Sequence, residues 1–354
     1  MAKGKNCLGL DIGSSSVKVC ELRSRKDQLH LEAFDYEELP PETIVDGELM
    51  NATAVADSVE QLLERNNIRR KPTALSVSGN TVIIKKITLP LMTQEELEES
   101  IQWEAEQFIP YEIDDVFIGF EVLAPKTEQG QMDVVLVAAK KEMINDYVEV
   151  CHRVGLKPMV VDVDSFVVQN MYEVNHGFHQ DETVNLLDMG NSVISMNIVK
   201  DGITTFTRDL SSGGSDITGE IQRQLNITFK EAEIYKMGGT PSGSGEDEVV
   251  PGEVERIIQD KAKEMAEEVQ ESINFYASTA AEGEIDRIVV TGGTGAIPSL
   301  RRIISSTTGV ECELANPFEA LEIDKGEYSP KQLEEWAPIA GVALGLALRR
   351  TNER

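Results

Sequence analysis

Basic residues are scarce in this chain of 354 residues, and their shortage excludes two kinds of partner. Lysine and arginine together number 33 against 62 aspartates and glutamates, which gives a net charge of −29. A surface this acidic repels nucleic acid and anionic membranes, so we expect neither as an electrostatic partner. Any site for a polyphosphate would need Mg²⁺ and a local lysine to offset the surrounding charge.

Cysteines and long hydrophobic runs are scarce as well. The four cysteines show no CxxC pair and no metal-site spacing, which favours reduced, structural thiols in a cytosolic protein. The longest apolar run, 337–348, has twelve residues. Because a membrane-spanning helix needs about 20, we expect none. Residues 1–6 lead directly into the first predicted strand, so we also expect no signal peptide and a soluble chain.

The most informative stretch, 8–19, has the pattern of a strand, a tight turn and a second strand. Asp11 stands at the tip of the first strand. The turn consists of small residues, Gly13, Ser14, Ser15 and Ser16. Such a turn directs successive backbone N–H groups at one point and forms an anion cradle, where Asp11 would hold a metal ion and Lys18 would neutralise a phosphate. An ordinary Gly/Ser hairpin has the same pattern, so this stretch alone leaves both interpretations open.

A second copy of this pattern lies at 184–199. Both copies read Asp-x-Gly-x-Ser after an apolar strand, and a further predicted strand follows each, at 29–39 and 202–210. The second copy places Asp188 at the strand tip. Its turn contains Gly190, Asn191 and Ser192. Two carboxylate-tipped turns in corresponding halves predict a duplicated domain that grips one polyphosphate from both sides.

A third motif completes the set. A buried strand from residue 288 runs into a glycine loop and then a helix. The loop contains Gly292, Gly293, Thr294 and Gly295. The order of the three motifs resembles the actin-like ATPase superfamily, and Asp11 to Lys18 matches the Asp-x-Gly-x-x-x-x-Lys spacing of actin. The resemblance implies an α/β protein with the actin-like ATPase fold, built from two duplicated lobes.

The first half of the chain carries an insertion, residues 81–139, where a strand–helix–strand–strand unit interrupts the βαβ rhythm. This insert resembles the 1C subdomain of the cell-division protein FtsA rather than the insertion of actin. Thr93 with Glu96, and Thr228 with Glu231, form predicted capping boxes at two helix starts. The resulting subdomains are 1A (1–80, 140–182 and 336–354), 1C (81–139), 2A (183–214 and 285–335) and 2B (215–284).

Two further stretches have distinctive compositions. The closing helix contains small residues at Ala340, Gly341, Gly345 and Ala347. Small residues at this spacing let two backbones approach closely, which predicts a helix crossing at the hinge between the lobes. Residues 238–252 are rich in Gly, Ser, Pro and Glu, which predicts an exposed loop.

Four stretches specifically resemble the PilM family of type IV pilus assembly proteins: 8–18, 101–110, 162–166 and 338–348. The resemblance implies a cytoplasmic ATP-binding adaptor without a membrane-inserted segment, peripheral to the inner membrane through its partner. That partner would be the short N-terminal cytoplasmic tail of PilN, held in a groove between subdomains 1A and 1C. Family partners also include the pilus motor ATPases.

The resemblance also assigns site residues. Asp11 and Asp188 would hold Mg²⁺ through water, the two turns and Lys18 would bind phosphates, and the glycine loop would approach the adenosine. Glu233 and Lys236 belong to an Ala-Glu-x-x-Lys segment like the one that borders the ribose and base in MreB-like relatives. A solvated helix face is the alternative for this pair.

Catalysis is less defined by the sequence. Asp162 and Asp164 precede the second turn, where they would orient the attacking water of a slow ATPase, serve a kinase, or only terminate a strand. A metabolite kinase would use the same three motifs but would phosphorylate a small molecule rapidly. An FtsA-like filament former would instead sediment as polymers. Both remain alternatives to the adaptor.

Aromatic residues make up 5% of the chain, so the acidic helix of the insert has little apolar surface to spare. We therefore assign Trp103 to the core of the insert, covering its small sheet. The apolar surface that remains would face subdomain 1A across a narrow slot. An extended peptide with two or three apolar side chains would anchor there.

Overall fold

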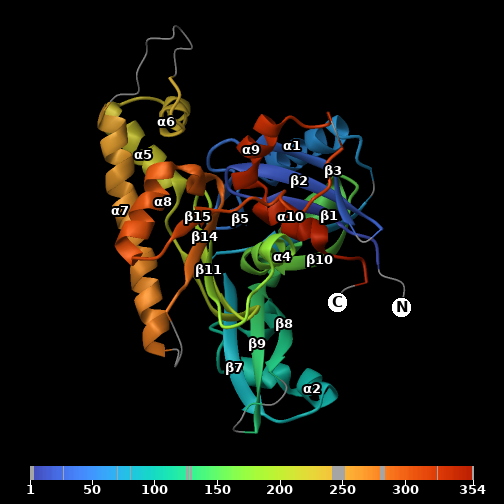
Figure 1. The fold of residues 1–354 in the computed structure, drawn as a ribbon. Helices are drawn as coiled ribbons and strands as arrows, with labels where there is room; N and C mark the ends of the chain where they lie inside the picture. The colour runs from blue at the N-terminus through green and yellow to red at the C-terminus, as the bar shows by residue number, and fades with distance from the viewer. Residues whose placement is uncertain are drawn as a thin grey trace.

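Each half of the chain forms a five-stranded sheet, and the two sheets repeat one strand order (Figure 1). The computed structural model describes residues 4–26, 28–69, 71–79, 81–124, 127, 130–240, 252–279, 284–324 and 326–352. The first sheet has the order β10 (Lys157–Val163), β6 (Pro72–Val77), β1 (Leu8–Ile12), β2 (Ser16–Arg25) and β3 (Gln28–Glu38). The second has the order β15 (Cys312–Leu314), β14 (Arg287–Thr291), β11 (Thr183–Met189), β12 (Ile194–Lys200) and β13 (Ile203–Leu210).

In both sheets three consecutive strands form an antiparallel meander, one later strand pairs with its first strand in parallel, and a second later strand pairs in parallel with that one. This shared topology confirms the duplication that the repeated Asp-x-Gly-x-Ser motif predicted. A two-stranded hairpin of β4 (Ile44–Val45) and β5 (Glu48–Leu49) is added to the first lobe.

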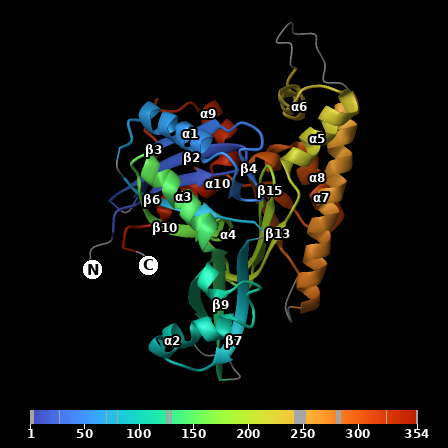
Figure 2. The same ribbon diagram turned by 180° about the vertical axis from the view of Figure 1, so that it is seen from behind.

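Helices fill three layers around the two sheets (Figures 1 and 2). The outer face of the first sheet is covered by α1 (Ala52–Arg65) and α3 (Lys141–Arg153). The outer face of the second is covered by α5 (Gly214–Leu225), α7 (Gly252–Thr279) and α8 (Pro298–Thr308), and α6 (Phe229–Lys236) packs against α5 and α7 at the end of the lobe. Between the sheets lie α4 (Asp164–His176) and α10 (Gly341–Leu348). In the chain, α9 (Pro330–Trp336) and the 3₁₀ turn η3 (Ala337–Ile339) come directly before α10, and the 3₁₀ turn η2 (Gly293–Ala296) follows β14.

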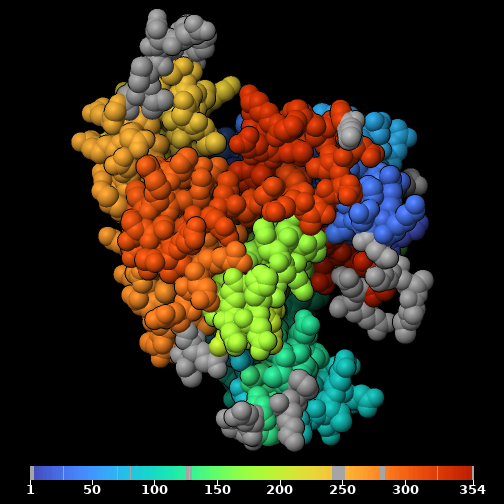
Figure 3. Space-filling model, viewed as in Figure 1, coloured from blue at the N-terminus to red at the C-terminus, as the bar shows by residue number. Residues whose placement is uncertain are grey.

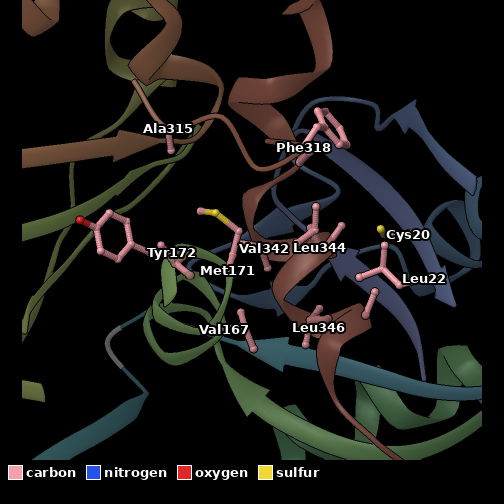
Figure 4. Close-up of a cluster of buried hydrophobic side chains, with 14 of the residues drawn as sticks. Cys20, Leu22, Val167, Met171, Tyr172, Ala315, Phe318, Val342, Leu344 and Leu346 are labelled. Carbon is pink, nitrogen blue, oxygen red and sulfur yellow. The ribbon is translucent and has the colours of Figure 1, made fainter. Parts of the chain in front are cut away.

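The central helix α10 is apolar on every side because both sheets and α4 surround it. Figure 4 shows Val342, Leu344 and Leu346 of α10 packed among residues of α4 and β2. A side chain at Gly345 would collide with the Val167 carbonyl of α4. The close crossing of helices predicted from the small residues is therefore confirmed.

The insert forms a separate three-stranded sheet that projects from the two lobes (Figures 1 and 3). Its strand order is β7 (Val82–Pro90), β9 (Gln131–Lys140) and β8 (Val116–Ala124), with α2 (Gln94–Ala105) and the 3₁₀ turn η1 (Ile113–Asp115). One face of the sheet packs with α2 in an apolar core of its own. Both predicted capping boxes, at the starts of α2 and α6, are confirmed.

The assignment of Trp103 to this core was wrong, because its side chain is 72% exposed. The buried stripe of α2 is Leu97, Ile101 and Ala105, at spacings of four residues. Each helical residue is rotated by about 100° from the one before, so Trp103 faces away from that stripe. The small sheet is covered without it.

Two predictions from the sequence stay predictions. The loop predicted at 238–252 lies largely outside the described residues. The boundaries of the four subdomains remain a prediction, although every strand of the insert's sheet falls within residues 82–140.

Among the helices that the structure describes, none combines the length and apolarity that crossing a bilayer requires.

Candidate functional site

A cleft of about 230 Å³ lies between the lobes, and the three sequence motifs meet in it. It is bounded by the turn after β1, the turn after β11 and the glycine loop after β14. β11 and β14 are parallel neighbours in the second sheet, so their carboxyl ends share an edge, and the turn after β1 comes from the first sheet. Of the predicted site residues the cleft is lined by Asp11, Gly13, Ser14, Ser15, Ser16, Lys18, Asp164, Asp188, Gly190, Asn191, Ser192, Glu233, Lys236, Gly292, Gly293 and Thr294.

Two predicted residues do not line the cleft. The carboxylate of Asp162 lies 3.3 Å from the guanidinium of Arg349, in an ion pair beside the last helix. Gly295 packs behind the glycine loop, where any side chain would collide with Val290. Of the two candidate catalytic carboxylates, only Asp164 reaches the cleft.

The first turn contains a carboxylate and a lysine that neutralise one another. Strand pairing places Asp11 directly opposite Lys18, and the ammonium lies 3.0 Å from the Asp11 carboxylate. Both side chains are only 11% exposed. The turn itself is closed by a 3.1 Å hydrogen bond from the Gly13 N–H to the Ser16 carbonyl. The characteristic spacing of Asp11 and Lys18 is thus a consequence of hairpin register.

The second turn has no such cation. The residue opposite Asp188 is Ser195. Burial raises the pKa of Asp188 to about 7, and the nearby carboxylates of Asp164 and Asp11 add to the shift. Burial and Asp11 likewise raise the pKa of Asp164 to about 6, although Ser76 donates a hydrogen bond to its carboxylate. The phosphate end of the cleft is therefore short of positive charge.

The two turns touch across the cleft. The Ser192 hydroxyl donates a 2.9 Å hydrogen bond to the Ser14 hydroxyl, and Thr294 of the glycine loop donates one of 2.8 Å to the Gly190 carbonyl. Three chain segments far apart in sequence thereby form one continuous wall. A polyphosphate in this cleft would meet backbone N–H groups from both lobes.

At the other end of the cleft, Glu233 and Lys236 project from α6. Lys236 is 8% exposed, and its ammonium donates hydrogen bonds of 2.7 Å to Glu233 and 2.9 Å to Thr218. Burial lowers the pKa of Lys236. The alternative of a solvated helix face is therefore wrong for Lys236. Gly292 has φ +87°, and a side chain there would collide with the Met189 carbonyl, so the backbone can approach a ligand closely.

An open groove lies between the insert and the start of α3. The insert contributes aromatic and apolar side chains to it, including Trp103, Ile109 and Tyr111. Acidic residues outnumber basic ones in its wall, with five glutamates or aspartates against Lys140 and Lys141. Both lysines are engaged: Lys140 lies 5.0 Å from the centre of the Tyr111 ring, and Lys141 donates a 2.6 Å hydrogen bond to the Asp114 carbonyl.

Residues 9–351 match the family model of the type IV pilus assembly protein PilM. The chain belongs to the PilM family. The solved PilM–PilN type IV pilus biogenesis complex contains a similar chain, 28% identical, with a TM-score of 0.86 and 99% of each chain covered. FtsA of Streptococcus pneumoniae is 23% identical over 90% of this chain and 77% of its own length. MreB 5 of Spiroplasma citri bound to AMPPNP is 12% identical, with a TM-score of 0.50 over 96% of this chain and 93% of that one. The fold is thus the actin-like ATPase fold, with an FtsA-like insertion.

Several residues of the cleft in this PilM-family chain escaped the sequence analysis. They are Ser76, Ser78, Gly79, Tyr147 and Ser195. The first three form a Ser-x-Ser-Gly pattern at the end of buried β6, where Ser76 is still in the strand and Ser78 and Gly79 follow it, and this pattern resembles the recognised turns. Tyr147 and Ser195 lie within a helix and a strand, where no local pattern distinguishes them.

The carboxylates of this PilM-family cleft do not form a metal cage. Within the described residues, no group of three or more His, Cys, Asp or Glu side chains is placed to hold a metal ion directly. Asp11, Asp164 and Asp188 nevertheless lie close enough to influence one another electrostatically. This donor set fits Mg²⁺, which keeps several of its waters and takes further oxygens from bound phosphates.

Proposed function

We propose that this PilM-family chain is a cytoplasmic adaptor of type IV pilus assembly that binds Mg²⁺-ATP in the cleft and the PilN N-terminal tail in the groove. The observation that carries the nucleotide part is the contact between Ser14 and Ser192, which brings both phosphate turns to one point. MreB 5, which shares the fold, is a nucleotide-bound relative. The partner part is supported by the similar chain in the PilM–PilN complex.

In the cleft, each group has a role that its position supports. Backbone N–H groups of 13–16 and 190–192 would hold the phosphates, with Lys18 as a point charge. Asp11 and Asp188 would orient waters on Mg²⁺. Gly292, Gly293 and Thr294 would lie along the adenosine, and Glu233 and Lys236 would border the ribose and base.

Asp164 is the candidate for orienting an attacking water. It begins α4 beside Asp11, and its pKa near 6 leaves part of the population protonated at neutral pH. A carboxylate whose pKa lies near the working pH is suited to act as a general base. We propose that hydrolysis is slow at most, as an adaptor that holds its nucleotide would require.

The groove supports the second binding site. Trp103 and Tyr111 offer aromatic surface, and the surplus of carboxylates favours a peptide with a basic residue beside its apolar anchors. Binding there would place this chain at the inner membrane through PilN, as a peripheral protein that the pilus motor ATPases would also contact. The subdomains 1A, 1C, 2A and 2B proposed from the sequence would then place the groove between 1A and 1C.

The test uses a synthetic PilN N-terminal peptide labelled with a fluorophore and titrated by anisotropy. Wild type should bind it, and Trp103→Ala should weaken binding at least tenfold, since loss of a central aromatic contact commonly costs about 2 kcal/mol. Phe275→Ala is the matched control because this aromatic residue is also exposed, at 54%, but lies on α7 of the other lobe. If the peptide fails to bind wild type, or if both variants behave alike, the groove is not the PilN site.

A further inference from the structure

The first strand of the insert is joined to the wall of the cleft. After β6 ends, Ser78 and Gly79 line the cleft, and β7 begins at Val82. Gly79 has φ +92°, a conformation that other residues rarely adopt. The start of β7 therefore lies only a few residues along the chain from the wall of the cleft.

The central strand of the insert is joined to the same wall by α3. β9 ends at Lys140 and α3 begins at Lys141, with no loop between them. One and a half turns later Tyr147 lines the cleft, where its hydroxyl donates a 3.1 Å hydrogen bond to the Gly47 carbonyl of the β4–β5 hairpin. The insert consequently has no flexible linker on this side that would separate its motion from that of the cleft.

A row of side chains in the second lobe reaches the root of the insert. Asp188, Ser195 and Asp209 are direct neighbours across β11, β12 and β13. Ser195 hydrogen-bonds the Asp209 carboxylate, which also accepts a 2.7 Å hydrogen bond from the Gly79 N–H. Because Gly79 belongs to the first lobe, this last bond crosses between the lobes. The row begins at a predicted Mg²⁺ residue and ends beside β7.

We propose that Asp209 couples the nucleotide cleft to the peptide groove. This inference rests on the proposed function of both sites. A nucleotide that both turns grip holds the second lobe against the first, so that Asp209 keeps its bond to Gly79 and fixes the root of β7. One wall of the groove, with Trp103 and Tyr111, belongs to the insert, and the other belongs to α3. A fixed insert keeps these walls at the spacing that the peptide needs, which lowers the cost of binding.

Coupling of this kind is reciprocal, because two ligands that favour one arrangement strengthen each other by the same factor. We expect Mg²⁺-ATP to lower the dissociation constant of the PilN peptide by at least about fivefold, which is the lower end of typical coupling between two sites. The experiment measures the peptide's dissociation constant by anisotropy without nucleotide and with saturating Mg²⁺-AMPPNP, which resists hydrolysis. The ratio of the two constants is the coupling factor.

The variants then locate the coupling. Asp209→Ala should bring the factor close to one, whereas Asp209→Asn, whose amide oxygen still accepts the Gly79 N–H, should retain most of it. Asp286→Ala is the matched control, because Asp286 also accepts a 2.7 Å backbone hydrogen bond, from Thr183, but within the second lobe. It should leave the factor unchanged. Should Asp209→Ala fail to fold, Ser195→Ala interrupts the row by removing a single hydroxyl and should reduce the factor.

The outcomes separate this inference from the function on which it rests. If wild type binds both ligands with a factor of one, the coupling is refuted and the adaptor function stands. If the coupling factor of Asp209→Ala equals that of wild type, the role of Asp209 is refuted. If Asp209→Ala does not fold, the same result for Ser195→Ala refutes it. If wild type binds no peptide in either state, the proposed function itself fails.

Discussion

The two Asp-x-Gly-x-Ser turns have the same backbone pattern but different electrostatics. In the first lobe, Asp11 faces Lys18 and the pair is neutral. In the second, Asp188 faces Ser195, and its pKa rises to about 7 because burial and the neighbouring carboxylates outweigh the opposing effect of Lys18. Duplication preserved the strand–turn–strand geometry, and one cross-strand position made the lobes different. The first turn carries its own cation, whereas the second has none opposite its carboxylate, and we propose that a cation arriving with the ligand compensates it there.

The largest effect should come from removing the cation of the first lobe. Lys18→Ala would leave Asp11 uncompensated beside Asp164 and Asp188, and would remove a charged contact to phosphate. Hydrogen bonds to charged groups contribute about 1.5–3 kcal/mol, so we expect ATP affinity to fall by roughly 10- to 100-fold in calorimetry. Lys261→Ala is the control, because Lys261 pairs with Glu264 on α7 and does not line the cleft, and it should bind ATP as wild type does. Equal affinities for both variants would remove Lys18 from the site.

A smaller effect should follow from the carboxylate of the second lobe. Asp188→Ala should weaken ATP binding at least about tenfold with Mg²⁺ present, a change equivalent to about 1.4 kcal/mol. In EDTA the same substitution should have little effect or should improve binding, since a buried carboxylate then only repels the phosphates. A loss of affinity that is the same with and without Mg²⁺ would show that Asp188 does not act through the metal.

The smallest effect concerns stability without ligand. In the folded chain the pKa values of Asp164 and Asp188 are about 6 and 7, above the usual value near 3.9 of an unfolded aspartate. Between pH 3.9 and these values the folded state binds more protons than the unfolded state. The two carboxyl groups therefore stabilise the fold fully at low pH, and the free energy of unfolding falls as the pH rises through 6 and 7. The melting temperature of the ligand-free protein should therefore drop by a few degrees between pH 5.5 and 8.

Asp188→Asn sharpens the comparison further. The amide cannot ionise, so the variant should melt at a higher temperature than wild type at pH 8 and should show a flatter pH profile. Glu231→Gln is a suitable control, because Glu231 lies in an exposed capping box where the pKa is lowered and titration is complete below this range. A wild-type melting temperature that rises steadily from pH 5.5 to 8 would contradict this account of the cleft.

Local chemistry made much of the cleft predictable. Asp11, Gly13 and Lys18 lie within one hairpin, so their relation is fixed by strand register and appears in the sequence as a spacing. The same holds for Asp188 and its turn. Gly292 was recognisable as part of a glycine loop after a buried strand, and the structure gives it a φ of +87°. The relation between the two carboxylates was inferred only from the repetition of the motif.

Contacts between distant segments were not predictable in this way. Asp209 has no motif of its own, and only the pairing of β13 with β12 and the approach of the other lobe bring it to Gly79. Asp162 and Asp164 looked equivalent, yet the first turns toward Arg349 and the second toward Ser76. Trp103 was misassigned because three smaller residues of α2 already filled the space above the insert's sheet.

The sequence by itself determined the two lobes, the three turns that line the cleft and the presence of an insert, because turn chemistry, strand patterning and helix caps act between neighbouring residues. The tertiary structure alone decided which carboxylates share the cleft, which cation compensates them, and which aromatic side chain remains exposed in the groove. Those outcomes depend on burial and on distances between segments that are far apart along the chain. Burial and through-space charge are properties of the packed molecule, and no single stretch of sequence contains them.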